Sequence, residues 1–253
     1  MTVRTATANG VAAIEIARPE KKNALTQAMY SAMADAIAAA DGDAAVRAVL
    51  ITGQPGVFTS GNDLEDFMRR PPASDDAPAL RFMRALSGCG KPVVAAVTGA
   101  AIGIGTTMLL HCDLVYVSDE ARLAMPFVGL GLVPEFASSL LVAQRVGRAK
   151  AAELLLLGEP FSGERAVEMG FANAVLPAGE VVPHARRMAE RFNALPPGAV
   201  RESKALLRRA QAQPVEEAIA AELDVFGRRL RSPEAQEAFQ AFFQKRKPDF
   251  SKF

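Results

Sequence analysis

Short apolar strands that end near glycines alternate with amphipathic helices in the first half of the sequence, and this alternation limits the possible folds more than any other feature. The runs Val46–Thr52 and Val93–Val97 are apolar and rich in β-branched residues, which is typical of buried strands. Apolar residues at helical spacing follow over Thr26–Asp41 and Ala79–Ser87. The pattern predicts an α/β core with largely parallel strands.

Further elements extend this core on both sides. Gly10–Ile16 alternates in the manner of a strand, and Asp113–Ser118 is predicted to be a third core strand. The polar and proline-rich stretch Arg69–Pro78 is expected to be a mobile loop. Beyond about Pro134 the signals are almost all helical, with Phe171–Leu176 as the one predicted strand.

The last third of the chain, from Gly179, is predicted to form three amphipathic helices. Breaks are expected at Leu195–Pro197 and at Gln213–Pro214, because proline disfavours helix in the residue before it. A helical tail on an α/β core often covers a ligand or a neighbouring subunit. We therefore divide the chain into a core and a C-terminal helical region, residues 1–195 and 196–253.

Composition excludes several classes of function. The 29 basic and 28 acidic residues leave a net charge of +1, so neither a nucleic acid nor an anionic membrane is an expected partner. Cys89, Cys112, His111 and His184 have no metal-ligand spacing, and two cysteines make no disulfide framework. The sequence has no signal-peptide pattern and no apolar run of about 20 residues, so a cytoplasmic location is expected.

Two junctions between a strand and a turn could hold a ligand, Phe58–Leu64 and Gly99–Thr107. Glycines in such turns let the backbone approach a ligand and direct free N–H groups at it. The second junction also begins a helix, whose N-terminus favours negative charge. Two N–H groups that converge on one oxygen would form an oxyanion hole. On spacing alone, two tight turns without a ligand remain the simpler interpretation.

A third candidate is the segment Leu130–Ser139, in which Pro134 is predicted to lie in the first turn of a helix. Glu135 would then either complement the helix dipole or act as a partly desolvated general base. The sequence alone favours the first interpretation. His111 is expected to be a packed side chain, and no Gly-x-Ser-x-Gly elbow supports a serine nucleophile.

Several segments, in the same order along the chain, resemble the enoyl-CoA hydratase/isomerase (crotonase) family. They include its strand followed by an Arg-Pro-x-x-x-Asn-Ala-Leu motif, its first oxyanion-hole turn, its Lys-Pro strand with a glycine turn, and a later Gly-Phe segment: Ile14–Leu25, Phe58–Leu64, Lys91–Gly105 and Phe161–Pro177. The resemblance implies a ββα spiral core with a helical C-terminal region. It also implies assembly as a homotrimer or as a hexamer made of two trimers.

The resemblance also implies a site for an acyl-CoA thioester. The backbone N–H groups of Asn62 and Ile104 would form the oxyanion hole, with Asn62 in place of the family's commoner alanine. No metal or redox cofactor is implied, because coenzyme A is part of the substrate. The remaining contacts with the substrate would come from Lys22, Ala24, Leu25, Ser60, Gly61, Asp63, Leu64, Gly103, Thr107 and Phe127.

Departures from the family pattern indicate which reaction to expect. Hydratases carry two catalytic glutamates, and this chain has Thr107 and Phe127 at the matching positions. The pair Pro134-Glu135 resembles the peroxisomal-type Δ3,Δ2-enoyl-CoA isomerases of fatty acid metabolism, whose matching glutamate is the catalytic base. The resemblance therefore implies an enoyl-CoA isomerase with Glu135 as base. Alternatives are an isomerase of aromatic-ring catabolism, a hydratase, and a non-catalytic protein that binds acyl-CoA.

Overall fold

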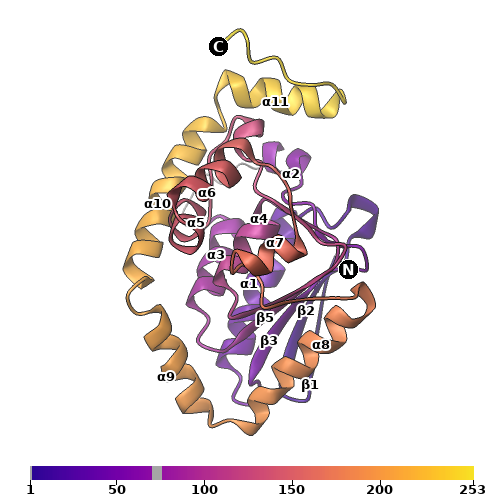
Figure 1. Ribbon diagram of the computed structural model, residues 1–253, viewed down its shortest axis with the longest axis vertical. Coiled ribbons are helices and arrows are strands. Elements are labelled where there is room, and N and C mark those ends of the chain that lie inside the picture. The colour runs from indigo at the N-terminus through magenta and orange to yellow at the C-terminus, as the bar shows by residue number, and fades with distance from the viewer. Residues whose placement is uncertain (1, 70–75) are drawn as a thin grey trace.

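The computed structural model describes residues 2–69 and 76–253 of the chain (Figure 1). Residues 70–75, most of the predicted mobile loop Arg69–Pro78, lie outside the described residues. The strands form a six-stranded sheet in the order β1-β2-β3-β5-β7-β10 and a four-stranded sheet in the order β4-β6-β8-β9. Their bounds are β1 Val3–Ala8, β2 Val11–Ile16, β3 Ala48–Thr52, β4 Val57–Thr59, β5 Val93–Val97, β6 Ala100–Ile102, β7 Leu114–Ser118, β8 Arg122–Ala124, β9 Phe161–Ser162 and β10 Ala174–Leu176.

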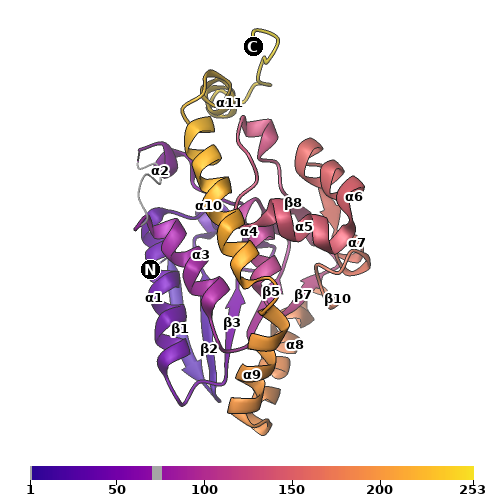
Figure 2. The same ribbon diagram turned by 90° about the vertical axis from the view of Figure 1, so that its left-hand side faces the viewer.

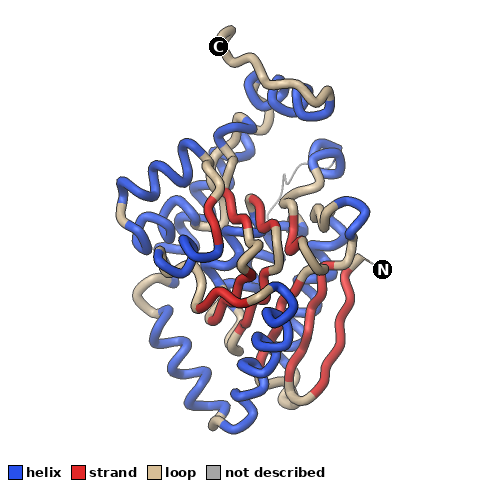
Figure 3. The backbone as a smooth tube through the Cα atoms, turned by 45° about the vertical axis from the view of Figure 1, so that its right-hand side comes forward, coloured by secondary structure: helices blue, strands red, loops and turns tan. Residues whose placement is uncertain are grey.

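Helices pack against these two sheets, and the β1–β2 hairpin forms an open edge (Figure 3). The α-helices are α1 Gln27–Gly42, α2 Leu64–Arg69, α3 Pro78–Gly88, α4 Ile104–Thr107, α5 Ser138–Val146, α6 Arg148–Ala152, α7 Gly163–Glu168, α8 Ala178–Glu190, α9 Pro197–Arg208, α10 Ala212–Arg229 and α11 Pro233–Phe243. A 3-10 turn, Met108–His111, continues α4. Among the described residues, no helix is both long and apolar enough to cross a membrane.

The central strands of the large sheet, β3, β5 and β7, are buried on both faces, which explains why they are so apolar, whereas the edge strand β1 is largely exposed. Alternate side chains of a strand point to opposite faces. In β3, Val49 and Ile51 pack into the main core, whereas Leu50 packs with Val181 and Ala185 of α8 in a second core. All pairs in this sheet are parallel except β1 with β2, so the predicted α/β core with largely parallel strands is confirmed.

The chain crosses from the large sheet to the small sheet three times in succession. Strands β3, β5 and β7 belong to the large sheet, and each is followed directly by a strand of the small sheet, β4, β6 and β8. This repeat is the predicted ββα spiral, which is confirmed. The expectation that Phe171–Leu176 would be the only strand after about Pro134 is wrong, because β9 lies at Phe161–Ser162. A strand of two residues leaves no periodicity to detect.

The last third of the chain, from about Gly179, holds four α-helices, α8 to α11, instead of the predicted three. The break at Leu195–Pro197 is confirmed, but Pro214 lies in the first turn of α10, where a missing N–H breaks no helical hydrogen bond. Helices α9 and α10 follow one another along one side of the molecule, and α11 lies at one end (Figure 2). Whether residues 196–253 form a separate unit stays a prediction.

Candidate active site

Strand pairing brings the two glycine-containing turns to the same place. In the parallel pair of β4 and β6, Thr59 lies opposite Ala101. Asn62 and Ile104 each follow their paired residue by three positions, so both turns leave the small sheet at the same edge. In the part of the chain that the structure describes, neither the Asn62 N–H nor the Ile104 N–H donates a hydrogen bond to another protein group. Both donors are therefore free to bind an oxygen of a ligand.

Glycine is required at two positions of these turns. Gly61 has a φ of 93°, and a Cβ built there would lie 3.0 Å from the carbonyl oxygen of Ile102. Gly103 has a φ of 57° and is the N-cap of α4. Residues that carry a side chain rarely adopt these positive φ values. The absence of a side chain at Gly61 also lets the first turn approach the backbone of Ile102 in the second.

The segment before α1 holds the first turn in position. Leu25 donates its N–H to the carbonyl oxygen of Gly61 (2.8 Å) and accepts from the N–H of Asp63 (2.9 Å). Arg18 donates to the Asp63 carboxylate at 2.6 Å and to the carbonyl oxygen of Ala24 at 3.0 Å. Burial works to raise the pKa of Asp63, but hydrogen bonds, first that from Arg18, outweigh it and lower this pKa. Asp63 therefore forms an ion pair with Arg18 that stabilises this turn.

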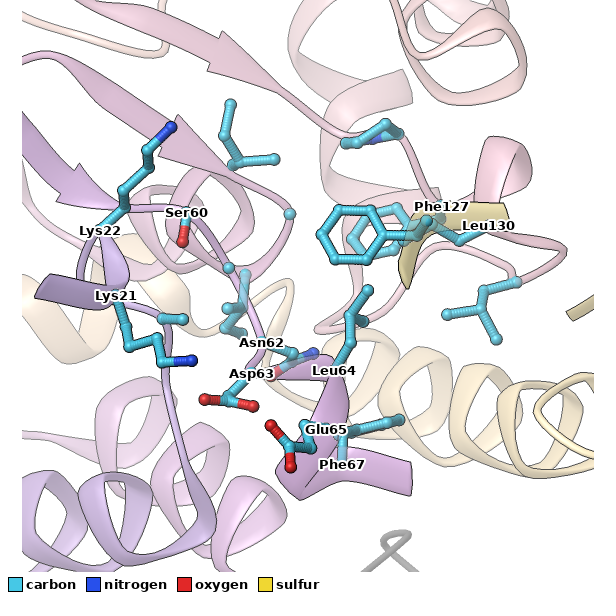
Figure 4. A pocket seen from close by; sticks show the side chains of 18 of the residues that line it. Lys21, Lys22, Ser60, Asn62, Asp63, Leu64, Glu65, Phe67, Phe127 and Leu130 are labelled. Carbon is cyan, nitrogen blue, oxygen red and sulfur yellow. The ribbon is translucent and has the colours of Figure 1, made fainter. Parts of the chain in front are cut away.

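A cavity of about 750 Å³ opens beside the two turns, a size typical of sites for small ligands. Lys21 and Lys22 lie on one side of it and Phe127 and Leu130 on the other, with Asn62 between them (Figure 4). Of the residues predicted to contact the substrate or form the oxyanion hole, most line it: Lys22, Ala24, Ser60, Gly61, Asn62, Asp63, Leu64, Gly103, Ile104 and Phe127.

Three predicted site residues lie behind this wall instead of on it. Leu25, Thr107 and Glu135 are buried and are not among the lining residues. The Thr107 hydroxyl donates to the Glu135 carboxylate at 2.6 Å. Because Thr107 ends the short helix that Ile104 begins, this bond ties the Glu135 carboxylate to the element that presents the second free N–H.

Glu135 is buried, with only 4% of the residue exposed. Burial raises its pKa to about 8; the hydrogen bond from Thr107 opposes this, and the charge of Glu222 adds to it. A carboxyl group with a pKa near neutrality can both take and return a proton under physiological conditions. The pKa of the buried Tyr30 hydroxyl is also raised, first by burial and then by the charge of Glu135. Tyr30 donates to the Asn62 side-chain oxygen at 2.5 Å.

The prediction that Pro134 and Glu135 lie in the first turn of a helix is wrong. Helix α5 begins at Ser138, and Glu135 lies in the irregular segment before it. Phe136 and Ala137 have φ values of 59° and 56°, so a left-handed turn separates Glu135 from α5. The interpretation of Glu135 as a first-turn charge is therefore excluded. His111 is packed as predicted, with its ring stacked on Phe136 at 3.7 Å.

Aromatic side chains that sequence reasoning missed also line the cavity. Phe67 of α2 contacts Phe226 of α10 edge to face, with ring centroids 5.8 Å apart. Phe242 and Phe243 of α11 also line the cavity. Their helical spacing is visible in the sequence, but spacing does not say which core surface a distant helix covers. The C-terminal region thus provides much of the apolar wall.

Comparison with known proteins identifies the family. The family model described as enoyl-CoA hydratase/isomerase matches residues 6–252. The chain belongs to this family. A probable enoyl-CoA hydratase of Bacillus subtilis is 30% identical over 246 residues, 95% of each chain. The human enoyl-CoA delta isomerase 2 is 33% identical over 94% of this chain and 62% of its own length.

Solved structures match the fold over nearly the whole chain. The structure of Pseudomonas aeruginosa OdaA matches with a TM-score of 0.94, at 54% identity over 95% of this chain and 98% of that one. The protein described here is therefore an acyl-CoA enzyme of the crotonase type, and its relatives include both hydratases and an isomerase.

Proposed function

We propose that this enzyme is a Δ3,Δ2-enoyl-CoA isomerase that uses Glu135 as its single acid–base group. The observation that carries the proposal is the burial of one carboxyl group, with a pKa raised to about 8, beside the helix that presents the Ile104 N–H. Thr107 and Phe127, at the positions where the family's hydratases carry glutamates, have no group that exchanges protons near neutral pH.

Other carboxylates near the cavity are already engaged or exposed. Among the described residues, the buried carboxylates are those of Glu135 and Glu222, and Glu222 accepts hydrogen bonds at the start of α5. Asp63 is paired with Arg18, and Glu65 forms an exposed pair with Arg69. Glu135 is therefore the carboxylate best suited to proton transfer.

The proposed reaction moves one proton within the substrate. The ionised Glu135 carboxylate removes a proton from C2 of a 3-enoyl-CoA, and the electron pair of the C2–H bond delocalises onto the thioester oxygen. The N–H groups of Asn62 and Ile104 bind this oxygen in the dienolate. The same carboxyl group then protonates C4, which leaves the conjugated 2-enoyl-CoA and an ionised Glu135. Since hydrogen bonds at catalytic sites often form only with substrate bound, the position of Glu135 behind the cavity wall is compatible with this role.

Lys21 and Lys22 support binding of the coenzyme A portion. Both lysines line the cavity at its rim, and their charges complement phosphate groups. The apolar wall of Phe67, Phe127 and Phe226 suits the acyl chain. A cytoplasmic location stays a prediction.

A hydratase is the second candidate, because relatives such as the Bacillus subtilis protein carry that name. Hydration requires a water held between acid and base groups. Among the described residues, Glu135 is the one buried carboxylate suited to hold and activate this water, and hydration needs a second group. The single carboxylate therefore favours isomerisation. An isomerase of ring catabolism would use the same single carboxylate, and a non-catalytic acyl-CoA-binding protein would have no need for it.

Isomerisation of 3-hexenoyl-CoA tests the proposed function, followed by the absorbance of the conjugated thioester between pH 6 and 9. The base must be ionised, and the pKa of Glu135 is about 8. We therefore expect kcat/KM to rise with pH and to level off above about 8, falling about tenfold for each pH unit below it. Absence of double-bond migration would refute the isomerase, and a rate independent of pH would refute Glu135 as its base. Crotonyl-CoA and saturated hexanoyl-CoA, assayed for hydration and thioester loss, separate the other candidates.

We also propose that the enzyme assembles as a homotrimer or hexamer. Leu206 and Leu207 of α9 are 66% and 84% exposed in the single chain, and Phe242 and Phe243 of α11 are also exposed. Leucine and phenylalanine side chains this exposed lose contact with water when subunits associate. Light scattering should give three or six times the 26.8 kDa of one chain. A monomer at micromolar concentration would contradict the proposal.

A further inference from the structure

The segment that carries Glu135 has an unfavourable backbone conformation. Phe136 and Ala137 are two successive non-glycine residues in the left-handed region. Single residues adopt this region at a cost, and such a conformation persists only where surrounding contacts impose it. The position of the Glu135 carboxylate therefore depends on whatever holds this turn.

Glu222 of α10 holds one side of the turn, from 85 residues further along the chain than Ala137. Glu222 is buried. One carboxylate oxygen accepts the N–H of Ala137 at 2.6 Å, and the other accepts the N–H of Ser139 at 2.9 Å and the Ser139 hydroxyl. Helix α5 has alanine at its N-cap, which offers no capping oxygen. Glu222 supplies that cap from another helix.

His111 holds the other side. Its Nε2–H donates to the carbonyl oxygen of Phe136 at 2.8 Å, and its ring stacks on the Phe136 ring. Burial lowers the pKa of His111 to about 4, so the ring is neutral at pH 7. His111 thus holds Phe136, and Glu222 holds the N–H groups of Ala137 and Ser139.

We propose that Glu222 is a positioning residue, which holds Glu135 in the place where it can reach C2 of the substrate. The inference rests on the proposed function. It extends the catalytic machinery from the core to α10, the same helix whose Phe226 lines the cavity. Glu222 does not itself line the cavity, so it acts through the turn and not by contact with the substrate.

The charge of Glu222 gives this role a signature that a purely structural contact would lack. Tyr30 of α1, Thr107 of α4 and Glu222 of α10 interact with Glu135, and His111 of the 3-10 turn contacts the next residue, Phe136. Tyr30 and His111 are neutral at pH 7. Burial raises the pKa of Glu222 as well, although its hydrogen bonds from Ser139 and Ala137 oppose this. Where Glu222 is ionised, loss of its negative charge should ease the ionisation of Glu135 and lower the pKa of Glu135.

The Glu222→Gln variant tests the proposal. The introduced amide would accept one of the two N–H groups and oppose the other, so the turn loses half of its cap. We expect kcat for 3-hexenoyl-CoA to fall about 10–100-fold, because a displacement near 1 Å has effects of this size. KM should change little, and the acid limb of the pH profile should move to lower pH. Glu217→Gln, an exposed position of the same helix, is the matched control and should leave kcat and the pH profile unchanged.

Two more variants separate position from charge. Glu222→Asp keeps the charge but draws the carboxylate back by one methylene, so kcat should fall while the acid limb stays in place. If Glu222→Gln fails to fold, the kcat of Glu222→Asp decides the proposal. Ser139→Ala removes one hydroxyl and leaves both N–H contacts, so its kcat should remain within about threefold of the wild type.

Unchanged kcat and an unmoved acid limb in Glu222→Gln would overturn the proposal. A wild-type enzyme without isomerase activity would instead overturn the proposed function. Amide hydrogen exchange over residues 136–141 then decides whether Glu222 holds the turn. Faster exchange in Glu222→Gln than in Glu217→Gln supports that role, and equal exchange refutes it.

Discussion

The Glu135→Gln variant is expected to lose about 10²–10⁴-fold or more of the isomerisation rate, because an amide can neither take nor return the migrating proton. Glutamine has nearly the same volume as glutamate, and its amide oxygen can still accept from the Thr107 hydroxyl. Fold and acyl-CoA binding should therefore remain. Turnover of 3-hexenoyl-CoA measures the loss, and calorimetry with hexanoyl-CoA measures binding. A variant with wild-type kcat would show that Glu135 is not the base.

The stability of the same variant provides an independent check. The pKa of Glu135 rises from 4.5 to about 8 on folding, so between these values the folded protein keeps a proton that the unfolded chain has lost. Its free energy of unfolding consequently falls by about 1.4 kcal/mol for each pH unit as the pH rises from 4.5 to 8. Glu135→Gln has no titrating group at this position, so the fall in its free energy of unfolding with rising pH should be smaller. Urea unfolding at pH 5 and 8 should show the variant gaining stability over the wild type mainly at pH 8, whereas Glu120→Gln, an exposed control, should not.

Hydration of crotonyl-CoA should be at least about 10²-fold slower than isomerisation of 3-hexenoyl-CoA, since each missing acid–base group contributes roughly this factor or more. Thr107 is fully buried, and its hydroxyl is bound to Glu135. Phe127 presents an aromatic ring to the cavity. Neither residue can activate water. Loss of the conjugated thioester absorbance of crotonyl-CoA at a rate similar to isomerisation would overturn this catalytic assignment.

The wild-type comparison is a cleaner test than an attempt to install hydratase activity. Thr107→Glu with Phe127→Glu would place carboxylates at both family positions. The first would add a second buried carboxylate beside Glu135, at a site that now holds a hydroxyl. Burial of an additional charge is costly, so instability could hide any gain of activity. The double variant is informative only if its thermal unfolding matches that of the wild type.

Much of the large sheet could be predicted because burial on both faces leaves a strong signal. Strands β3, β5 and β7 are short apolar runs, and each was predicted within two residues of its observed bounds. The small sheet escaped prediction, because its strands have two or three residues and no periodicity develops over that length. The true start of α10 was missed because Pro214 signals a break and also suits a first turn. The separate helix α11, which begins at Pro233, was also missed.

The site was predictable where main-chain geometry decides it and unpredictable where distant contacts decide it. Glycines marked both turns with free N–H groups, and the resemblance to a family supplied their role. The left-handed turn at Phe136 and Ala137 leaves no mark in the sequence, because neither residue prefers that conformation and Glu222 imposes it from another helix. The aromatic wall from α10 and α11 likewise depends on how the C-terminal region folds back over the core.

The register between β4 and β6 also bears on which mutations this site can survive during evolution. Both oxygen-binding donors belong to the main chain, three residues beyond the paired Thr59 and Ala101. Apart from Gly61, Asp63 and Gly103, exchange of a side chain in either turn leaves these donors in place, because neither donor belongs to a side chain. An insertion or deletion of one residue in only one turn would move its donor by about 3.3 Å relative to the other, further than a shared hydrogen-bond acceptor tolerates. The number of residues in each turn is therefore constrained together with its glycine.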